Sequence, residues 1–345
     1  MRAVRGSRAL GAMVAALAAV GAVAVAAPSA AQEITTRRPV ATYSIVARDP
    51  ATGEMGVAVQ SHWFSVGAIV PWAEAGVGAV ATQSFVEPSY GPLGLDLMRM
   101  GRSAPEALKA LVTTDANESV RQVAMVDAQG RVAAHTGSMA IYAAGHHVGE
   151  GFSTQANMME NPTVWDAMAR AFETARGDLA ERLLAALEAA EGEGGDIRGR
   201  QSAAIIVVSG TSTGKPWLDR KFDLRIEDHP TPVPELRRLV HLQRAYNALN
   251  EGDGLVTEGD IPGAMEAYTR AMELVPDAAT NGEAPFWVGI TLASIGREDD
   301  ALPYLRRATA QDPRWAELMG RLPAAGLLPD ADVATRLLRR LRAGG

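Results

Sequence analysis

The chain of 345 residues contains no cysteine. Disulfide bonds, thiolate nucleophiles and cysteine-ligated zinc sites are therefore excluded. The absence does not fix the compartment, but it is compatible with an oxidising one. Lysine is almost lacking as well, since it occurs only at Lys109, Lys215 and Lys221, and arginine supplies nearly all of the positive charge.

Net basic charge is missing too, because the formal net charge is −7. No basic stripe with interleaved aromatic residues occurs, so nucleic acid is not expected as a partner. Long apolar runs are too few for a protein with several membrane spans. The length is sufficient for two domains and a sizeable core.

The N-terminus does contain an export pattern. Arg2, Arg5 and Arg8 precede an alanine- and valine-rich stretch over residues 9–27, and small residues lead to Ala31. This pattern predicts a secretory signal peptide over residues 1–31, followed by a polar tether over 32–41. An uncleaved membrane anchor is the alternative, but alanine is only weakly apolar and the cleavage site is well formed. We therefore expect an exported protein, periplasmic or extracellular.

Residues 42–232 alternate short apolar runs with turn signals. The segment Asp49-Pro50-Ala51-Thr52-Gly53 joins the first two runs, as expected of a β-hairpin. We expect strands at residues 42–48, 56–60, 77–84, 120–126, 132–134, 152–158, 203–209 and 222–226, and helices at 93–100, 104–112, 163–174 and 179–191. Such strands, buried against other strands and interrupted by helices, predict a layered α+β domain.

From residue 233 onward the pattern is helical and contains a repeat. The segment from Leu249 to Pro276 is echoed from Ala293 to Pro313. The period is typical of helix–turn–helix repeats. We therefore expect a tetratricopeptide-like helical domain over residues 233–345 that binds a protein partner. Because two repeats are fewer than independent stability usually needs, they should dock on the first domain or on flanking helices.

A family resemblance covers a little more than half of the chain. It is carried by several blocks in order: Thr42–Asp49, Gly56–Ser61, Val70–Ala73, Gly76–Gln83, Ser89–Pro92, Gly149–Phe152 with Gln155 and Asn157, Arg198–Ala204 and Asp223–Pro230. With these blocks, residues 42 to about 238 resemble the domain of unknown function 1028 family. The resemblance implies the N-terminal-nucleophile (Ntn) hydrolase superfamily, with its four-layer αββα sandwich, and an unknown substrate.

Thr42 is the residue on which this resemblance bears most. In an Ntn hydrolase the first residue is the nucleophile, and its own α-amine is the base. Signal cleavage after Ala31 would leave ten residues ahead of Thr42, so a second cut between Ala41 and Thr42 would be required. The alternative is an ordinary strand residue, which β-branching favours at this position.

Polar residues at strand ends or within apolar strands are candidates for the rest of the site, because buried amides must be hydrogen-bonded. Asn157 is the candidate oxyanion donor, since asparagine supplies two N–H groups from a rigid strand. An equal alternative is that these polar residues only hydrogen-bond neighbouring backbone groups; it holds for Gln60, Ser61, Gln83, Gln155 and Asn157. For Arg200 the equal alternative is a structural salt bridge. The candidate substrate-binding residues are Gln60, Ser61, Gln83, Gln155, Arg200 and Gln201.

No cofactor or metal is expected. His146 and His147 lie near Glu150, but the spacing does not match a zinc-protease helix, and Gly145 and Gly149 favour a loop.

Together with the family resemblance, the sequence predicts an exported Ntn-type amidohydrolase acting on a small or envelope-derived amide. The alternative is a non-catalytic envelope binding or scaffold protein that uses the sandwich as a ligand-binding core and the repeats for a protein partner. A homo-oligomer stays open.

Overall fold

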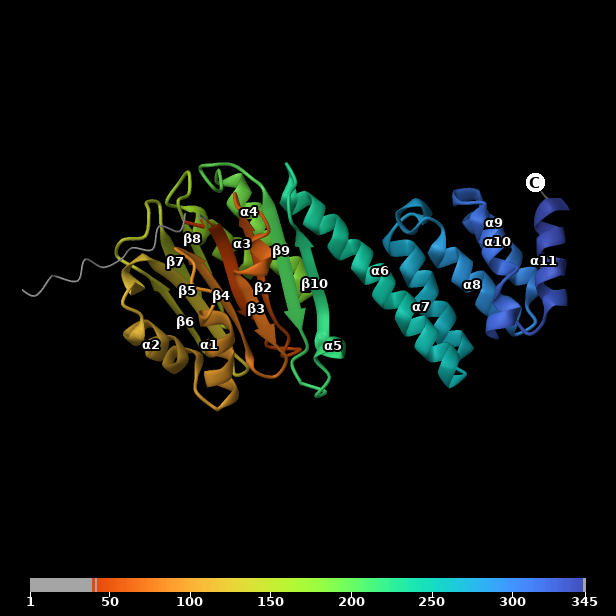
Figure 1. Cartoon of the computed structure of the whole chain (residues 1–345), viewed down its shortest axis with the longest axis horizontal. Coiled ribbons are helices and arrows are strands. Elements are labelled where there is room, and N and C mark those ends of the chain that lie inside the picture. Colours follow the sequence, from red (N-terminus) through yellow and green to blue (C-terminus); the bar gives the residue numbers. More distant parts are fainter. Residues whose placement is uncertain (1–38, 41, 344–345) are drawn as a thin grey trace, which may run out of the picture. The chain divides into compact units, whose positions relative to one another are not determined.

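The structure is a computed structural model that describes residues 39–40 and 42–343. The predicted signal peptide and most of the predicted tether lie outside the described residues. The chain forms a mixed α/β domain with two antiparallel sheets, followed by a helical C-terminal region (Figure 1). No helix in the described ranges has the length and apolar character needed to span a bilayer.

Six strands make the larger sheet, in the order β10-β9-β2-β1-β8-β7. The hairpin predicted at the first turn joins the two central strands: the Asp49 carboxylate accepts the N–H groups of Ala51 and Thr52, and Gly53 has a positive φ of 74°. The strands are β1 (Thr42–Arg48), β2 (Met55–Ser61), β7 (Gly145–Gly149), β8 (Phe152–Asn157), β9 (Ser202–Val208) and β10 (Arg220–Ile226).

Four strands make the smaller sheet, in the order β3-β4-β5-β6. They are β3 (Pro71–Glu74), β4 (Gly78–Ser84), β5 (Arg121–Asp127) and β6 (Val132–Thr136). Alternate side chains of the two sheets meet in one core, to which Val46 and Val59 contribute from the larger sheet and Ala81 and Ala124 from the smaller. The two sheets therefore lie face to face.

Helices cover the outer face of each sheet (Figure 1). On the smaller sheet lie α1 (Tyr90–Arg99) and α2 (Ala104–Thr114), and on the larger lie α3 (Val164–Thr174) and α4 (Leu179–Gly192). The predicted N-cap of α2 is a full capping box, in which Ser103 and Glu106 satisfy each other's backbone N–H groups. The apolar face of α4, with Leu183 and Leu187, packs into a core with Tyr43 and Ile45 of β1.

Beyond the sheets the chain is helical, as predicted from residue 233 onward. Its helices are α6 (Pro232–Glu258), α7 (Ile261–Leu274), α8 (Glu283–Ser294), α9 (Glu298–Gln311), α10 (Arg314–Met319) and α11 (Ala331–Ala343); α5 (Pro216–Asp219) is a short turn before β10. The first turns of α6 place Val233, Leu236 and Val240 in the core beneath the larger sheet. Later turns place Ala248 and Leu249 in a separate helical core.

The predicted loop around His146 and His147 is wrong, because residues 145–149 form the edge strand β7, paired with β8. The two glycines that favoured a loop serve close packing instead. A Cβ on Gly145 would lie 2.5 Å from the Trp165 ring, and one on Gly149 would lie 2.1 Å from the Phe152 ring. An edge strand is also half-exposed, so its sequence carries no continuous apolar run.

Candidate active site

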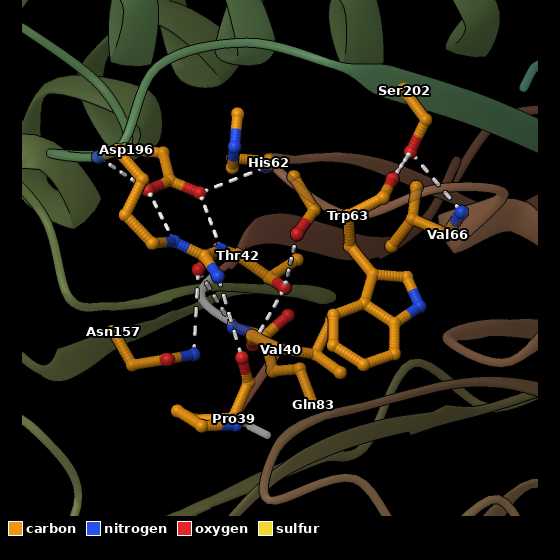
Figure 2. A network of polar contacts seen from close by, with 12 residues as sticks. Pro39, Val40, Thr42, His62, Trp63, Val66, Gln83, Asn157, Asp196 and Ser202 are labelled. Carbon is orange, nitrogen blue, oxygen red and sulfur yellow. Dashed lines mark hydrogen bonds and ion pairs between the residues drawn. The ribbon is translucent and has the colours of Figure 1, made fainter. Parts of the chain in front are cut away.

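Thr42 is the first residue of β1, a central strand paired on one side with β2 and on the other with β8. Its side chain points between the sheets and is fully buried. The hydroxyl Oγ1 donates a hydrogen bond to the Val40 carbonyl oxygen at 2.8 Å, and the Ser61 hydroxyl oxygen lies 3.3 Å away (Figure 2). The predicted nucleophile is therefore held by two oxygen contacts between the two sheets.

Two amide side chains converge on the carbonyl oxygen of Thr42. Gln83 Nε2 from β4 donates to it at 3.2 Å, and Asn157 Nδ2 from β8 lies at 3.5 Å (Figure 2). Both amides also donate to Gln122 Oε1 of β5, at 2.7 and 3.0 Å. The start of β1 is thus tied to both sheets by side chains rather than by the backbone ladder alone.

This polar network extends deeper between the sheets. Ser44 donates to Gln83 Oε1 and accepts from Gln155 Nε2, each at 2.6 Å. Gln122 Nε2 lies within hydrogen-bond distance of the Thr136 hydroxyl and of the backbone carbonyls of Gly145 and Ala156. Polar groups therefore replace apolar packing at this end of the sandwich, where the amides of Gln83, Gln122 and Gln155 have defined partners.

The segment directly before Thr42 also lies in the site. Val40 is fully buried and belongs to the core between the sheets. Its N–H donates to the Ser84 carbonyl at 2.7 Å, and its carbonyl accepts the Ser84 N–H at 3.2 Å. Val40 thus pairs with the end of β4 in the smaller sheet, whereas Thr42 begins a strand of the larger one.

A partly buried ion pair lies beside this segment. The Asp196 carboxylate has no exposed surface and accepts the backbone N–H of His62 at 2.9 Å. It also holds the Arg198 guanidinium, whose Nη2 lies 2.9 Å from Asp196 Oδ2. Arg198 Nη1 in turn donates to the Pro39 carbonyl at 3.4 Å. Figure 2 shows Asp196 and His62 on one side of Thr42, with Pro39 on the other.

The structure brings together five of the eight predicted site residues: Thr42, Ser61, Gln83, Gln155 and Asn157. Gln60 is not among them, because it pairs with Tyr43, whose side chain packs in the core under α3 and α4. Neighbouring strand residues face opposite sides of a sheet, so Gln60 and Ser61 cannot both face Thr42. The donor role assigned to Asn157 for the oxyanion stays a prediction.

Arg200 and Gln201 lie away from the Thr42 hydroxyl. Arg200 pairs with Glu191, which also accepts the Tyr43 hydroxyl. Burial, and after it the Glu191 carboxylate, raises the pKa of the Tyr43 phenol well above its usual value, so Tyr43 is a hydrogen-bond donor here. Gln201 Nε2 donates to Asp228 at 3.2 Å and its carbonyl accepts the His229 N–H. These contacts tie together the segments flanking β9 and β10.

Sequence reasoning missed Gln122 and the partnership of Asp196 with Arg198. Gln122 lies within the apolar run 120–126, just as Gln83 lies within 77–84, so a polar residue inside an apolar strand is the signal that marks both. Asp196 and Arg198 lie two residues apart in a loop whose glycines and acidic residues indicate exposure to solvent. In the part of the chain that the structure describes, no group of three or more histidine or acidic side chains gathers as metal ligands.

Comparison with known proteins finds a matching family and two similar solved structures. A family model described as "Family of unknown function (DUF1028)" matches residues 42–236. A crystal structure of a Silicibacter pomeroyi protein from that family is 32% identical, with a TM-score of 0.52 over 58% of this chain and 84% of that chain. The ancestral β-subunit Anbu of Yersinia bercovieri is 12% identical, with a TM-score of 0.30 over 62% of this chain and 95% of that chain. No curated protein matches.

Proposed function

The chain belongs to the DUF1028 family, and we propose that it is an exported amidohydrolase of the Ntn type, with Thr42 as nucleophile. The two facing sheets, with helices on each outer side, support the four-layer αββα fold of that superfamily. The substrate class expected from the sequence is a small or envelope-derived amide. A periplasmic or extracellular location and a tetratricopeptide-like partner-binding role for residues 233–345 belong to the same proposal.

One observation carries the proposal: Thr42 is at once the first residue of the family match and the first residue of the central strand β1. An N-terminal nucleophile must stand at the start of a rigid element, because its α-amine and its hydroxyl act as one unit. The hydroxyl is buried beside a second hydroxyl, that of Ser61, and the main chain of Thr42 is fixed by Gln83 and Asn157. This preorganisation is what covalent catalysis requires.

The reaction would proceed in two steps once the chain is cut between Ala41 and Thr42. The Thr42 oxygen attacks the substrate carbonyl carbon, the α-amine takes the hydroxyl proton, and an ester forms as the C–N bond breaks. The leaving amine departs with that proton. Water then attacks the ester, which releases the carboxylate and restores the hydroxyl. Backbone N–H groups or the Asn157 amide would stabilise the oxyanion in both steps.

A non-catalytic binding protein is the second candidate, and a specific observation favours it. Val40 is anchored by two backbone hydrogen bonds to Ser84, and the Thr42 hydroxyl donates to the Val40 carbonyl. While this segment stays in place, the amine of Thr42 is an amide nitrogen and cannot act as a base. A chain that is never cut would therefore keep the sheet domain as a scaffold.

The N-terminus of the mature protein tests the proposal. We would express the full chain in an export-competent host and determine its intact mass and N-terminal sequence. The hydrolase requires a chain beginning at Thr42, and this chain should react with an alkyne-bearing β-lactone that acylates N-terminal threonine. A mature protein that begins at Gln32 and stays unlabelled would overturn the proposed mechanism.

Matched variants separate reactivity from folding. Thr42→Ala should abolish labelling, whereas Thr42→Ser should keep some of it. Thr82→Ala is the control, since Thr82 is also a fully buried strand threonine with one hydrogen bond, to the Glu87 carbonyl. Equal labelling of the wild type and Thr42→Ala would assign the reactive group elsewhere.

A further inference from the structure

The pairing of Val40 with Ser84 has the form of a bound peptide. Two antiparallel backbone hydrogen bonds connect the residues, at 2.7 and 3.2 Å. The valine side chain is fully buried in the core between the sheets. Strand addition of this kind recognises an extended chain through its main-chain groups, while a pocket for the side chain gives specificity.

Ser84 itself has an unusual backbone conformation and a hydroxyl without a partner in the described part of the chain. Its φ of 70° lies in the left-handed region, which a serine adopts at a cost, and such strain gathers at ligand clamps and active sites. Its hydroxyl is buried and has no hydrogen-bond partner among the described residues. Asn157 Oδ1, at the end of β8, is buried and unpartnered in the same sense. Buried polar atoms nearly always have partners, so both atoms are available to a ligand at this end of the sandwich.

Exposed apolar side chains belong to the loops around the same end. Phe64, Tyr142 and Ile197 are 64%, 80% and 60% exposed. Hydrogen bonds tie these loops to the strand ends. Met158, directly after Asn157, donates its N–H to the Ile141 carbonyl, and its own carbonyl accepts the Ile197 N–H, each at 3.2 Å. The loop of Phe64 joins through the bond from His62 to Asp196. Three exposed apolar side chains thus belong to loops that are hydrogen-bonded near the strand ends at Thr42.

We propose that the place occupied by Pro39 and Val40 is a substrate subsite, and that the substrate is an extended peptide. The Ser84 backbone would pair with the residue two positions before the scissile bond, where a compact apolar side chain fits the space of Val40. Arg198 would hold the carbonyl one residue further out, as it holds that of Pro39. The apolar loops would contact residues beyond it.

This subsite rests on the proposed function for its catalytic meaning, but its occupancy can be measured without catalysis. The probe is a fluorescein-labelled peptide with the sequence of residues 37–41, Arg-Arg-Pro-Val-Ala. The protein is the full chain with Thr42→Ala, which removes the nucleophile, and with Val40→Asp, which displaces the chain's own segment from the apolar space. Fluorescence anisotropy reports binding. The matched peptide carries aspartate in place of valine.

The valine peptide should bind the double variant at least about tenfold more tightly than the aspartate peptide, because burial of a valine side chain is worth about 1.5–3 kcal/mol. The single variant Thr42→Ala should bind neither, since its own Val40 fills the site. Val40→Gly in place of Val40→Asp gives a second, milder displacement, and circular dichroism confirms that each variant is folded. Equal binding of both peptides, or binding of neither to either displaced variant, overturns the subsite.

The cut before Thr42 is followed separately in chains that keep the threonine. If the chain cuts itself, Val40→Ile should be processed like the wild type and Val40→Asp at least about tenfold more slowly, by the same burial energy. Peptide binding in a protein that is never cut supports the proposed subsite and contradicts the proposed hydrolase mechanism. If the wild type is cut and its Thr42 is reactive, but the displaced variants show no preference between the peptides, the hydrolase proposal is supported and the subsite proposal is contradicted.

Discussion

At the scale of single residues, Gln122 is the centre of the site. One side chain receives the amides of Gln83 and Asn157 and donates toward two backbone carbonyls and the Thr136 hydroxyl. Leaving a buried polar group without its partner costs about 1–3 kcal/mol, much more than a satisfied hydrogen bond contributes. The network therefore depends on this residue more than on any single contact to Thr42.

We predict that Gln122→Met lowers the free energy of unfolding by about 2–4 kcal/mol, because the partners on both strands lose their bonds while the volume is nearly kept. Urea unfolding followed by circular dichroism measures the change. Gln243→Met is the matched control, since Gln243 bonds only its helical neighbour Asn247 at the surface, and it should change stability by less than about 0.5 kcal/mol. A loss below about 1 kcal/mol for Gln122→Met would mean that the network is dispensable.

Strand alternation decides how much of the site was predictable. Ser61, Gln83, Gln155 and Asn157 follow from polar residues at the ends of apolar strands or within them, and all four belong to the polar network that includes Thr42. Gln60 satisfied the same criterion, but it is adjacent to Ser61 and must face the helices. Asp196 is brought in by a loop whose path no periodicity describes, so its contact with His62 was not predictable.

At the scale of elements, glycines in one helix differ in what surrounds them. In α6, a Cβ on Gly252 would lie 2.4 Å from the ring of Tyr268, a fully buried residue of α7. Gly254, two residues later, is exposed and has nothing within 4 Å of the same position. The first glycine permits the close approach of two helices, whereas the second has no such use.

We therefore predict opposite effects for two substitutions in α6. Gly252→Ala should destabilise the helical region by about 1–3 kcal/mol, because the Tyr268 ring has to move. Gly254→Ala should stabilise it by about 0.5–1 kcal/mol, since alanine loses less backbone freedom in a helix. Thermal unfolding of both variants measures the difference. Shifts of the same sign would show that the contact with Tyr268 does not limit the packing of these helices.

Element types were predictable where packing and periodicity agree. The expected boundaries of β1 and α2 hold to within two residues, because the β-branched Thr42, Ile45 and Val46 precede a turn and Ser103 caps the helix. The edge strand β7 was not predictable, since its two glycines serve aromatic neighbours and its histidines are partly exposed. A glycine's role can be read from sequence only when the neighbour it accommodates is known.

At the scale of the whole molecule, α6 belongs to two cores. Its first turns bury Val233, Leu236 and Val240 with the sheet domain, although the sequence pattern changes at residue 232. Arg237 pairs with Glu181 and Glu188 of α4, and Arg244 pairs with Asp178. The sheet domain is therefore completed by the start of the helical region.

This sharing predicts where the chain can be shortened. A protein that ends at Thr231 should lose several kcal/mol of stability, because three buried side chains at about 1.5–3 kcal/mol each are removed. That is a large share of the stability of an ordinary domain. A protein that ends at Arg244 keeps these side chains and the ion pairs, and should stay soluble. Soluble yield and melting temperature compare the two. Equal melting temperatures would show that α6 contributes nothing to the sheet domain.

The chain crosses from one sheet to the other at the site. Val40 is bonded to the smaller sheet and Thr42 to the larger, so the chain passes from one sheet to the other between these two residues. A cut of the chain before Thr42 would break this connection between the sheets. The same cut would set free an amine beside the hydroxyl. Cleavage of the backbone would thus start the activity in a single irreversible step that no ligand can reverse.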